Sequence, residues 1–172
     1  ILRNETKNGQ VIFTDVTAET APGLLNAGIV NDAVWTDLDG DGYPELMLAI
    51  EWSPVELFIN NKGKLLRATT AAGLDKTTGL WCSLTAADID GDGDMDFIAG
   101  NAGLNTQFKA SPTEPLELFA ADFDGNGIVD PLITYYIDGK PYPVASRDEL
   151  LEQLPGLKKK FLYYKNYAAG GL

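Results

Sequence analysis

The sequence has 172 residues and a formal charge of −12, from 25 acidic and 13 basic side chains, so its field repels a phosphate backbone and excludes nucleic acid as a partner. It contains no histidine, which excludes imidazole metal ligands and nucleophiles activated by a neighbouring imidazole. No apolar run approaches the ~18 residues of a membrane-spanning helix, so we expect no membrane insertion.

The first strong pattern along the chain is an acidic loop at residues 37–45 between two apolar segments. Residues 33–36 and 46–49 are predicted to be the strands that enter and leave this loop. Residues 54–60 and 64–68 are two further predicted strands, separated by an Asn-Lys-Gly turn. The four segments together predict an antiparallel unit of the size of a propeller blade.

The pattern of strand, acidic loop and strand recurs around residues 88–96 and residues 122–130. The apolar segments that flank these two loops are residues 84–87, 97–100, 118–121 and 132–135. Residues 101–115 are rich in Asn, Gly, Ser, Thr and Pro, so we expect a loop there in place of outer strands. The single cysteine, Cys82, lies in an apolar stretch, which favours a buried structural thiol over a reactive one.

The last part of the chain changes character. Residues 135–137 and 142–144 flank an Asp-Gly-Lys turn, which predicts a hairpin. Ser146 and Glu149 have the spacing of a capping box, so we expect a short helix that ends near Leu154, before a Pro-Gly pair.

A second helix is predicted for residues 157–168. It contains three consecutive lysines at residues 158–160, followed by Phe161, Tyr163, Tyr164 and Tyr167. We interpret this composition as a solvated lysine face and a buried aromatic face, in preference to a nucleic-acid patch.

All three loops fit the pattern Asp-x-Asp-x-[Asp/Asn]-Gly-x-x-[Asp/Glu], and they hold 12 of the 25 acidic residues and no base. Oxygens at positions 1, 3 and 5 converge when the backbone curls round a cation, and glycine at position 6 permits the sharp turn. Position 7 then offers its backbone carbonyl, and the acid at position 9 closes the shell. The predicted ligands are Asp37, Asp39, Asp41, Tyr43, Glu45, Asp88, Asp90, Asp92, Asp94, Asp96, Asp122, Asp124, Asn126, Ile128 and Asp130.

Calcium is the metal that these oxygen donors favour, with about three ions per chain. Magnesium is the weaker choice because it prefers a small octahedron and retains water, and zinc is disfavoured without histidine or paired cysteines. A helix-flanked calcium hand would need glutamate at position 12, where this chain has Leu48, Ala99 and Ile133. Three bound ions would reduce the formal charge from −12 to −6.

These residues resemble the FG-GAP/VCBS repeats of integrin-like β-propellers. The resemblance covers roughly residues 13–137 and is closest at residues 34–42 and 88–96. Residues 101–105 and 154–167 are also similar to bacterial secreted proteins of this type. In that family the calcium loop joins neighbouring strands of a blade and is structural, so the resemblance implies ligands at positions 1, 3, 5, 7 and 9. Asn126 and Glu45 are mild departures from an all-Asp loop.

The resemblance implies an all-β fold of antiparallel, propeller-like blades with a short helical C-terminal segment. The length suffices for about three blades, whereas propellers close with four to eight, so we expect a fragment of a larger ring or an open array. The expected organisation is repeat blades with three calcium loops over residues 1–145 and a helical tail packed on them over residues 146–172. The expected location is extracytoplasmic: secreted, periplasmic or at the cell surface.

The leading functional hypothesis is a non-catalytic, calcium-binding repeat scaffold that binds a protein or carbohydrate ligand at the cell surface. Its candidate contact points are Trp52, residues 101–105 and the tyrosine-rich tail. One alternative is a glycan hydrolase or lyase that uses paired acids, but the remaining acids Asp15, Glu51 and Glu56 form no constellation. The other alternative is a purely architectural module of a larger secreted protein.

Overall fold

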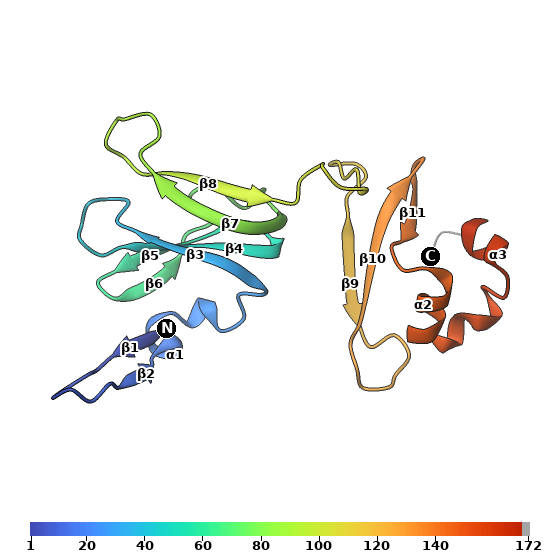
Figure 1. Ribbon diagram of the computed structural model, residues 1–172, viewed down its shortest axis with the longest axis horizontal. Coiled ribbons are helices and arrows are strands. Elements are labelled where there is room, and N and C mark those ends of the chain that lie inside the picture. The colour runs from blue at the N-terminus through green and yellow to red at the C-terminus, as the bar shows by residue number, and fades with distance from the viewer. Residues whose placement is uncertain (170–172) are drawn as a thin grey trace. The chain divides into compact units, whose positions relative to one another are not determined.

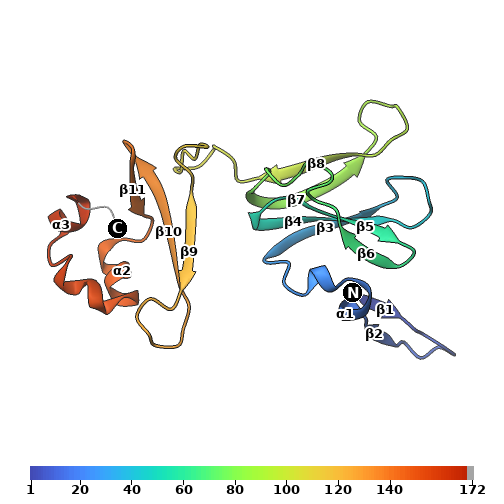
Figure 2. The ribbon, with the colours of Figure 1, turned by 180° about the vertical axis from the view of Figure 1, so that it is seen from behind.

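The computed structural model describes residues 1–169 and is mostly β, with antiparallel sheets and a few short helices. The chain divides into two compact units, Ile1–Gly103 and Leu104–Leu172 (Figures 1 and 2). The boundary between the units follows Gly103, whereas the expected boundary between repeats and tail follows residue 145. The third acidic loop and the C-terminal helices therefore belong to the same unit. Residues 170–172 of the expected tail lie outside the described residues.

The N-terminal unit begins with a small hairpin and two short helices that sequence patterns do not predict. Strands β1 (Leu2–Asn4) and β2 (Phe13–Asp15) pair antiparallel, and α1 (Thr17–Thr20) and the 3-10 helix η1 (Pro22–Leu24) follow. These elements are too short for a periodic hydrophobic pattern, which explains why sequence analysis passes over them.

The predicted four-stranded antiparallel unit is confirmed. It comprises β3 (Val30–Thr36), β4 (Glu45–Ser53), β5 (Glu56–Asn61) and β6 (Lys64–Arg67). Strand β4 pairs with both β3 and β5, and β5 pairs with β6. The first six residues of β4 are all buried, because its alternating side chains enter two core clusters on opposite faces of the sheet. Strand β4 is therefore the centre of this unit.

Strands β7 (Gly79–Ala87) and β8 (Asp96–Asn101) form the next antiparallel pair, and β7 joins the end of β4. Strands β3, β4 and β7 each contain one register shift, at Asn31, Trp52 and Cys82 respectively. A bulge of this kind shifts the alternation of side chains along a strand. The prediction of a buried Cys82 is wrong for this reason: the thiol lies exposed although Cys82 belongs to a largely apolar stretch.

The C-terminal unit has a three-stranded antiparallel sheet in the order β11-β10-β9, followed by helices. The strands are β9 (Glu117–Ala121), β10 (Asp130–Ile137) and β11 (Lys140–Pro143), and β10 and β11 form the predicted hairpin. Residues 102–116 before β9 form turns and irregular backbone, as their composition predicts. Helix α2 (Arg147–Gln153) begins at the predicted capping box of Ser146 and Glu149, and it packs on Leu132 of β10.

The second predicted helix is wrong in its extent. Residues 157–168 are divided between a 3-10 helix, η2 (Pro155–Lys159), and helix α3 (Tyr164–Ala169). Arg147 interrupts the helix because its guanidinium donates hydrogen bonds to the carbonyls of Phe161 (2.7 Å) and Leu162 (2.9 Å). In a continuous helix these carbonyls would accept from residues 165 and 166 instead.

The aromatic residues of this segment are only partly buried, contrary to the predicted aromatic face. Phe161 lies in the core, with 2% of its surface exposed, but Tyr163 and Tyr164 are exposed by 59% and 60%. Tyr163 lies two residues from Phe161 and would face away from it in any helix. For Tyr164, the interruption of the helix between Lys159 and Tyr164 removes the face that it would share with Phe161.

Within residues 1–169 the strands form open sheets, so a closed propeller stays a prediction. No helix in the described part of the chain is long and apolar enough to cross a membrane.

Candidate metal centres

The three acidic loops occupy equivalent places in the fold. Each joins two neighbouring antiparallel strands: β3 to β4, β7 to β8, and β9 to β10. Figure 1 shows each loop as a rounded excursion from the end of its strand pair. In all three loops position 9 is also the first residue of the outgoing strand, as Glu45, Asp96 and Asp130. The strand pairing therefore fixes both ends of each loop.

Position 1 organises the backbone of each loop. One carboxylate oxygen accepts a hydrogen bond from the N–H of the glycine at position 4, and the other from that of the glycine at position 6. The distances are 3.0 and 3.0 Å at Asp37, 2.7 and 3.1 Å at Asp88, and 2.7 and 2.9 Å at Asp122. All six of these glycines have positive φ, between 74° and 96°, which glycine adopts without steric cost. The backbone consequently curls round one aspartate.

The remaining positions follow one scheme as well. Position 3 accepts from the N–H of position 5, position 5 accepts from that of position 7, and position 9 accepts from that of position 2. The last contact measures 2.8 Å from Leu38 to Glu45, 2.9 Å from Ile89 to Asp96 and 3.0 Å from Phe123 to Asp130. The contacts of positions 3 and 5 range from 2.7 to 3.2 Å over the three loops. Asn126 uses its amide oxygen as the aspartates at position 5 use a carboxylate.

This scheme brings carboxylate oxygens together. In each loop three acids place one oxygen each within 4.8 Å of the others. The groups are Asp37, Asp39 and Asp41; Asp88, Asp90 and Asp96; and Asp122, Asp124 and Asp130. Two oxygens bound to one Ca²⁺ at about 2.4 Å can be at most about 4.8 Å apart, so the convergence is compatible with one calcium ion in each loop. The donors are all hard oxygens, which fits calcium and not a thiophilic metal.

The group in the first loop differs from the other two at position 9. Asp96 and Asp130 belong to their groups, but the first group comprises positions 1, 3 and 5 and does not include Glu45. Glu45 is 1% exposed, and its second oxygen accepts a hydrogen bond from the N–H of Asn60 in β5 (3.2 Å). The extra methylene of glutamate allows this reach. Glu45 therefore joins the loop to a third strand, a contact that the pattern of the loop does not predict.

Position 7 presents its side chain outwards in the first and third loops. Tyr43 and Ile128 are exposed by 41% and 68%, so only the backbone carbonyl of this position is available to an ion inside the loop. Asp92 and Asp94 of the second loop lie outside the group of three converging acids. The structure thus brings together three of the five predicted donors in each loop by their carboxylates, and the complete ligand set stays a prediction.

Electrostatics in the loops favours a bound cation. The pKa of Asp122 lies below its usual value because backbone N–H groups donate hydrogen bonds to its carboxylate. The N–H of Gly127 has the largest effect, followed by those of Gly125 and Asn126, and together they outweigh some desolvation. The three loops carry formal charges of −4, −5 and −3 within nine residues each. Like charges at this density repel one another, so a divalent cation would stabilise each loop.

Asp15, Glu51 and Glu56, the acids outside the loops that the sequence suggested as catalytic candidates, each make a separate structural contact. Glu56 is buried, accepts a hydrogen bond from Thr69 (2.9 Å) and pairs with Arg67 (3.1 Å). Glu51 accepts from Asn31 (3.0 Å), and Asp15 accepts from Thr17 at the start of α1. These contacts do not bring the three acids together into one site.

Two polar residues of β3 are structurally important although sequence reasoning missed them. Asn31 also donates to the carbonyl of Trp81 (2.9 Å), and Asp32 accepts from the N–H of Leu84 (2.9 Å). Both contacts join β3 to β7, and they span 50 and 52 residues of sequence. No local pattern distinguishes such residues from polar residues on a solvated strand face.

Of the predicted contact points, Trp52 is half-buried and has a positive φ of 59° at the bulge of β4. Asn101 accepts hydrogen bonds from the N–H groups of Leu80 and Gly103, both at 3.2 Å, and so anchors the turn that follows β8. The structure therefore assigns Asn101 a clear structural role.

Comparison with known proteins identifies a family for part of the chain. Residues 37–99 match the model of an FG-GAP-like repeat, which confirms the resemblance over a stretch that begins with the first acidic loop and ends after the second. The third loop lies outside the matched residues. No curated protein matches the chain.

Proposed function

We propose that this chain, whose residues 37–99 form an FG-GAP-like repeat, is a calcium-binding and non-catalytic scaffold of the extracytoplasmic space. It would present a protein or carbohydrate ligand site at the cell surface. The observation that carries the calcium proposal is the hydrogen-bond scheme common to all three loops, which turns their carboxylates towards one point. A solvated acidic surface would not require the same scheme three times.

The proposed role of calcium is structural. In each loop the ion would be held by the acids at positions 1 and 3, with further oxygens from positions 5, 7 and 9. Its charge offsets the repulsion among the carboxylates, which the folded loop holds closer than an unfolded chain does. Binding is therefore coupled to folding, and it stabilises the junction between each incoming and outgoing strand.

The proposed location follows from the same chemistry. Calcium sites of extracellular modules are commonly weak, with dissociation constants of about 10⁻⁴–10⁻³ M, and such sites fill where free calcium is abundant. The loops are exposed and short, which favours this weak class over tightly binding buffer sites. FG-GAP repeats are typically extracellular, which supports the same location.

The proposal is tested by isothermal titration of the calcium-free chain with CaCl₂ and, separately, with MgCl₂. We expect about three Ca²⁺ per chain and weaker binding of Mg²⁺. The substitutions Asp37→Asn, Asp88→Asn and Asp122→Asn should each remove about one ion. Asp138→Asn is the matched control, because Asp138 is exposed on the β10–β11 turn with a φ of 49°, which asparagine tolerates. Absence of calcium uptake would refute the proposal.

The non-catalytic part of the proposal has its own test. The calcium-loaded chain is incubated with a panel of glycan substrates, and we expect no turnover above that of the chain heated to inactivation. Turnover that disappears on Glu51→Gln, with calcium stoichiometry unchanged, would instead identify an enzyme.

A further inference from the structure

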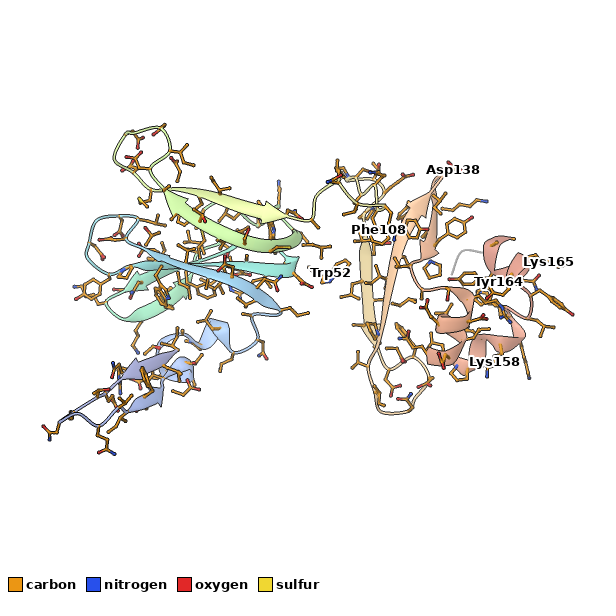
Figure 3. The ribbon with its side chains drawn as sticks, in the orientation of Figure 1. Trp52, Phe108, Asp138, Lys158, Tyr164 and Lys165 are labelled. Atoms are coloured by element: carbon orange, nitrogen blue, oxygen red, sulfur yellow. The ribbon has the colours of Figure 1, made fainter. Side chains whose placement is uncertain are left out.

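The segment formed by η2, the following turn and the start of α3 carries an unusual surface for an acidic protein. We call it the lysine–tyrosine segment; it consists of Lys158, Lys159, Lys160, Leu162, Tyr163, Tyr164 and Lys165. All seven side chains are exposed, and Leu162, Tyr163 and Tyr164 are exposed by 58%, 59% and 60%. Figure 3 shows Lys158, Tyr164 and Lys165 on the helical side of the C-terminal unit, away from β9.

The charge of this surface opposes that of the rest of the chain. Residues 153–172 contain four lysines and no acid, whereas the whole chain has a formal charge of −12. Within residues 1–169, none of the four lysines forms an ion pair. Of the three acids on α2, Asp148 pairs with Arg147 and accepts from Tyr164, and Glu149 accepts from Ser146. The third, Glu152, is exposed and lines the same hollow as Lys158, so it offsets part of the charge of one lysine. Lys160 and Lys165 lie over the rings of Phe161 and Tyr163, at 5.1 and 5.9 Å from the ring centroids, and these contacts leave their charges exposed to a partner.

The exposure of the apolar side chains is imposed by their neighbours. Phe161 is buried against α2 and lies edge-on to Tyr167, with the ring centroids 5.5 Å apart. The guanidinium of Arg147 holds the carbonyls of Phe161 and Leu162, and it also lies 5.1 Å from the ring centroid of Tyr164. With Phe161 directed into the core and the carbonyls of Phe161 and Leu162 held by Arg147, the side chains of Leu162 and Tyr163 are directed outwards. The apolar exposure is therefore a property of the packed fold.

We propose that the lysine–tyrosine segment docks on the surface of an anionic lipid bilayer. Lysines close to such a surface are attracted to its headgroups, while tyrosine and leucine side chains bury in the headgroup region. This is adsorption to one leaflet and requires no spanning segment. It goes beyond the proposed calcium scaffold, because none of these residues belongs to a calcium loop.

The composition of the segment favours a bilayer over an acidic polysaccharide. A polysaccharide presents many hydroxyl groups, and those that lose water on binding need hydrogen-bond partners, which amide, hydroxyl and carboxylate side chains supply. Residues 157–165 contain no Asn, Gln, Ser, Thr, Asp or Glu; between the lysines they have only Phe, Leu and Tyr. Apolar side chains flanked by lysines match a partner whose anionic surface covers an apolar layer.

The acidity of the remaining chain weakens this attraction but does not abolish it. Charges farther away than about 8 Å are largely screened at physiological ionic strength, so the local surplus of lysine decides the contact. Calcium in the loops would reduce the opposing charge further. High salt should weaken docking, because the attraction of the lysines to the headgroups is itself screened.

The test is flotation of the full chain with vesicles, in the presence of calcium and with folding verified by circular dichroism. Vesicles of phosphatidylglycerol and phosphatidylcholine should bind the chain, and vesicles of phosphatidylcholine alone should not. Each lysine near the surface contributes about fivefold in affinity, so K158Q/K159Q/K160Q should lower the affinity about 100-fold. The matched control is K62Q/K64Q/K76Q, which removes three exposed lysines of the N-terminal unit and should leave binding unchanged.

A second variant separates the apolar contribution from the charge. Leu162→Ser with Tyr163→Ser keeps all lysines and should weaken binding severalfold. Equal binding to both vesicle types would overturn the proposal, as would equal loss in the two triple-lysine variants. Two further outcomes would also overturn it. Undiminished calcium-dependent binding of K158Q/K159Q/K160Q would mean that calcium bridges the acidic loops to lipid, and lysine-dependent binding to alginate without vesicle binding would identify an acidic polysaccharide as the partner.

Discussion

Glu45 and Asn60 connect the first acidic loop to a strand outside it. The buried carboxylate of Glu45 accepts the backbone N–H of Asn60 at 3.2 Å, and the side chain of Asn60 donates to the carbonyl of Pro44 at 2.9 Å. The two residues thus join loop, β4 and β5 in both directions. This contact distinguishes the first loop from the other two, where an aspartate stands at the same position.

Glu45→Asp tests whether this residue acts through the strand contact or through the metal. The shorter side chain cannot reach Asn60, so a backbone N–H loses its partner, and we expect a loss of about 1–3 kcal/mol in the free energy of unfolding. Urea denaturation is measured with calcium and with chelator. The same loss under both conditions supports the strand contact, and a loss only with calcium would show that Glu45 acts as a ligand. Glu19→Asp, at an exposed position, is the control.

Gly127→Ala tests the backbone conformation of a loop. Gly127 has a φ of 86°, and a Cβ built there meets no heavy atom within 4 Å, so the cost comes from the backbone alone. We expect destabilisation of about 1–2 kcal/mol, measured by thermal or urea unfolding. Gly156→Ala in the same unit also meets nothing within 4 Å but has no positive φ, and it should be neutral. Equal effects of the two substitutions would contradict the strained turn.

Asp32→Asn tests a pH-dependent link between β3 and β7. Hydrogen bonds from the backbone N–H groups of Leu84 and then Ala33 lower the pKa of Asp32 below its usual value. A lowered pKa contributes stability that is present above the unfolded pKa of about 3.9 and is lost as pH falls through the folded value. The wild type should therefore exceed the variant in stability at neutral pH, and the difference should shrink below about pH 4. A difference that is independent of pH would contradict this account.

Cys82 should react in the folded protein. The thiol is exposed at the bulge of β7, with only a weak contact to the carbonyl of Leu80 at 3.4 Å. We expect complete modification by a thiol reagent under native conditions, at a rate close to that in denaturant, as mass spectrometry can follow. Modification that requires denaturant would show that the residue is protected in solution.

Much of the fold follows from local patterns. The acidic loops, the strands that flank them, the β10–β11 hairpin and the capping box of α2 each have a signature within about ten residues, and the structure has all of these elements. The aromatic composition of residues 161–167 predicts one buried face on a continuous helix, whereas Tyr163 and Tyr164 are exposed. Arg147 decides otherwise, and its contact with the carbonyls of Phe161 and Leu162 spans 14 and 15 residues.

The three acidic loops are the part that the sequence determines by itself. Glycines at positions 4 and 6 and acceptors at positions 1, 3, 5 and 9 curl the nine residues, and every hydrogen bond of this common scheme lies inside the loop. Three features are decided only by the tertiary structure: the contact of Glu45 with Asn60, the contact of Asp32 with Leu84, and the exposure of Cys82. These depend on strand pairing and bulges, which shift side chains between the faces of a sheet, and no local pattern records which strands will meet.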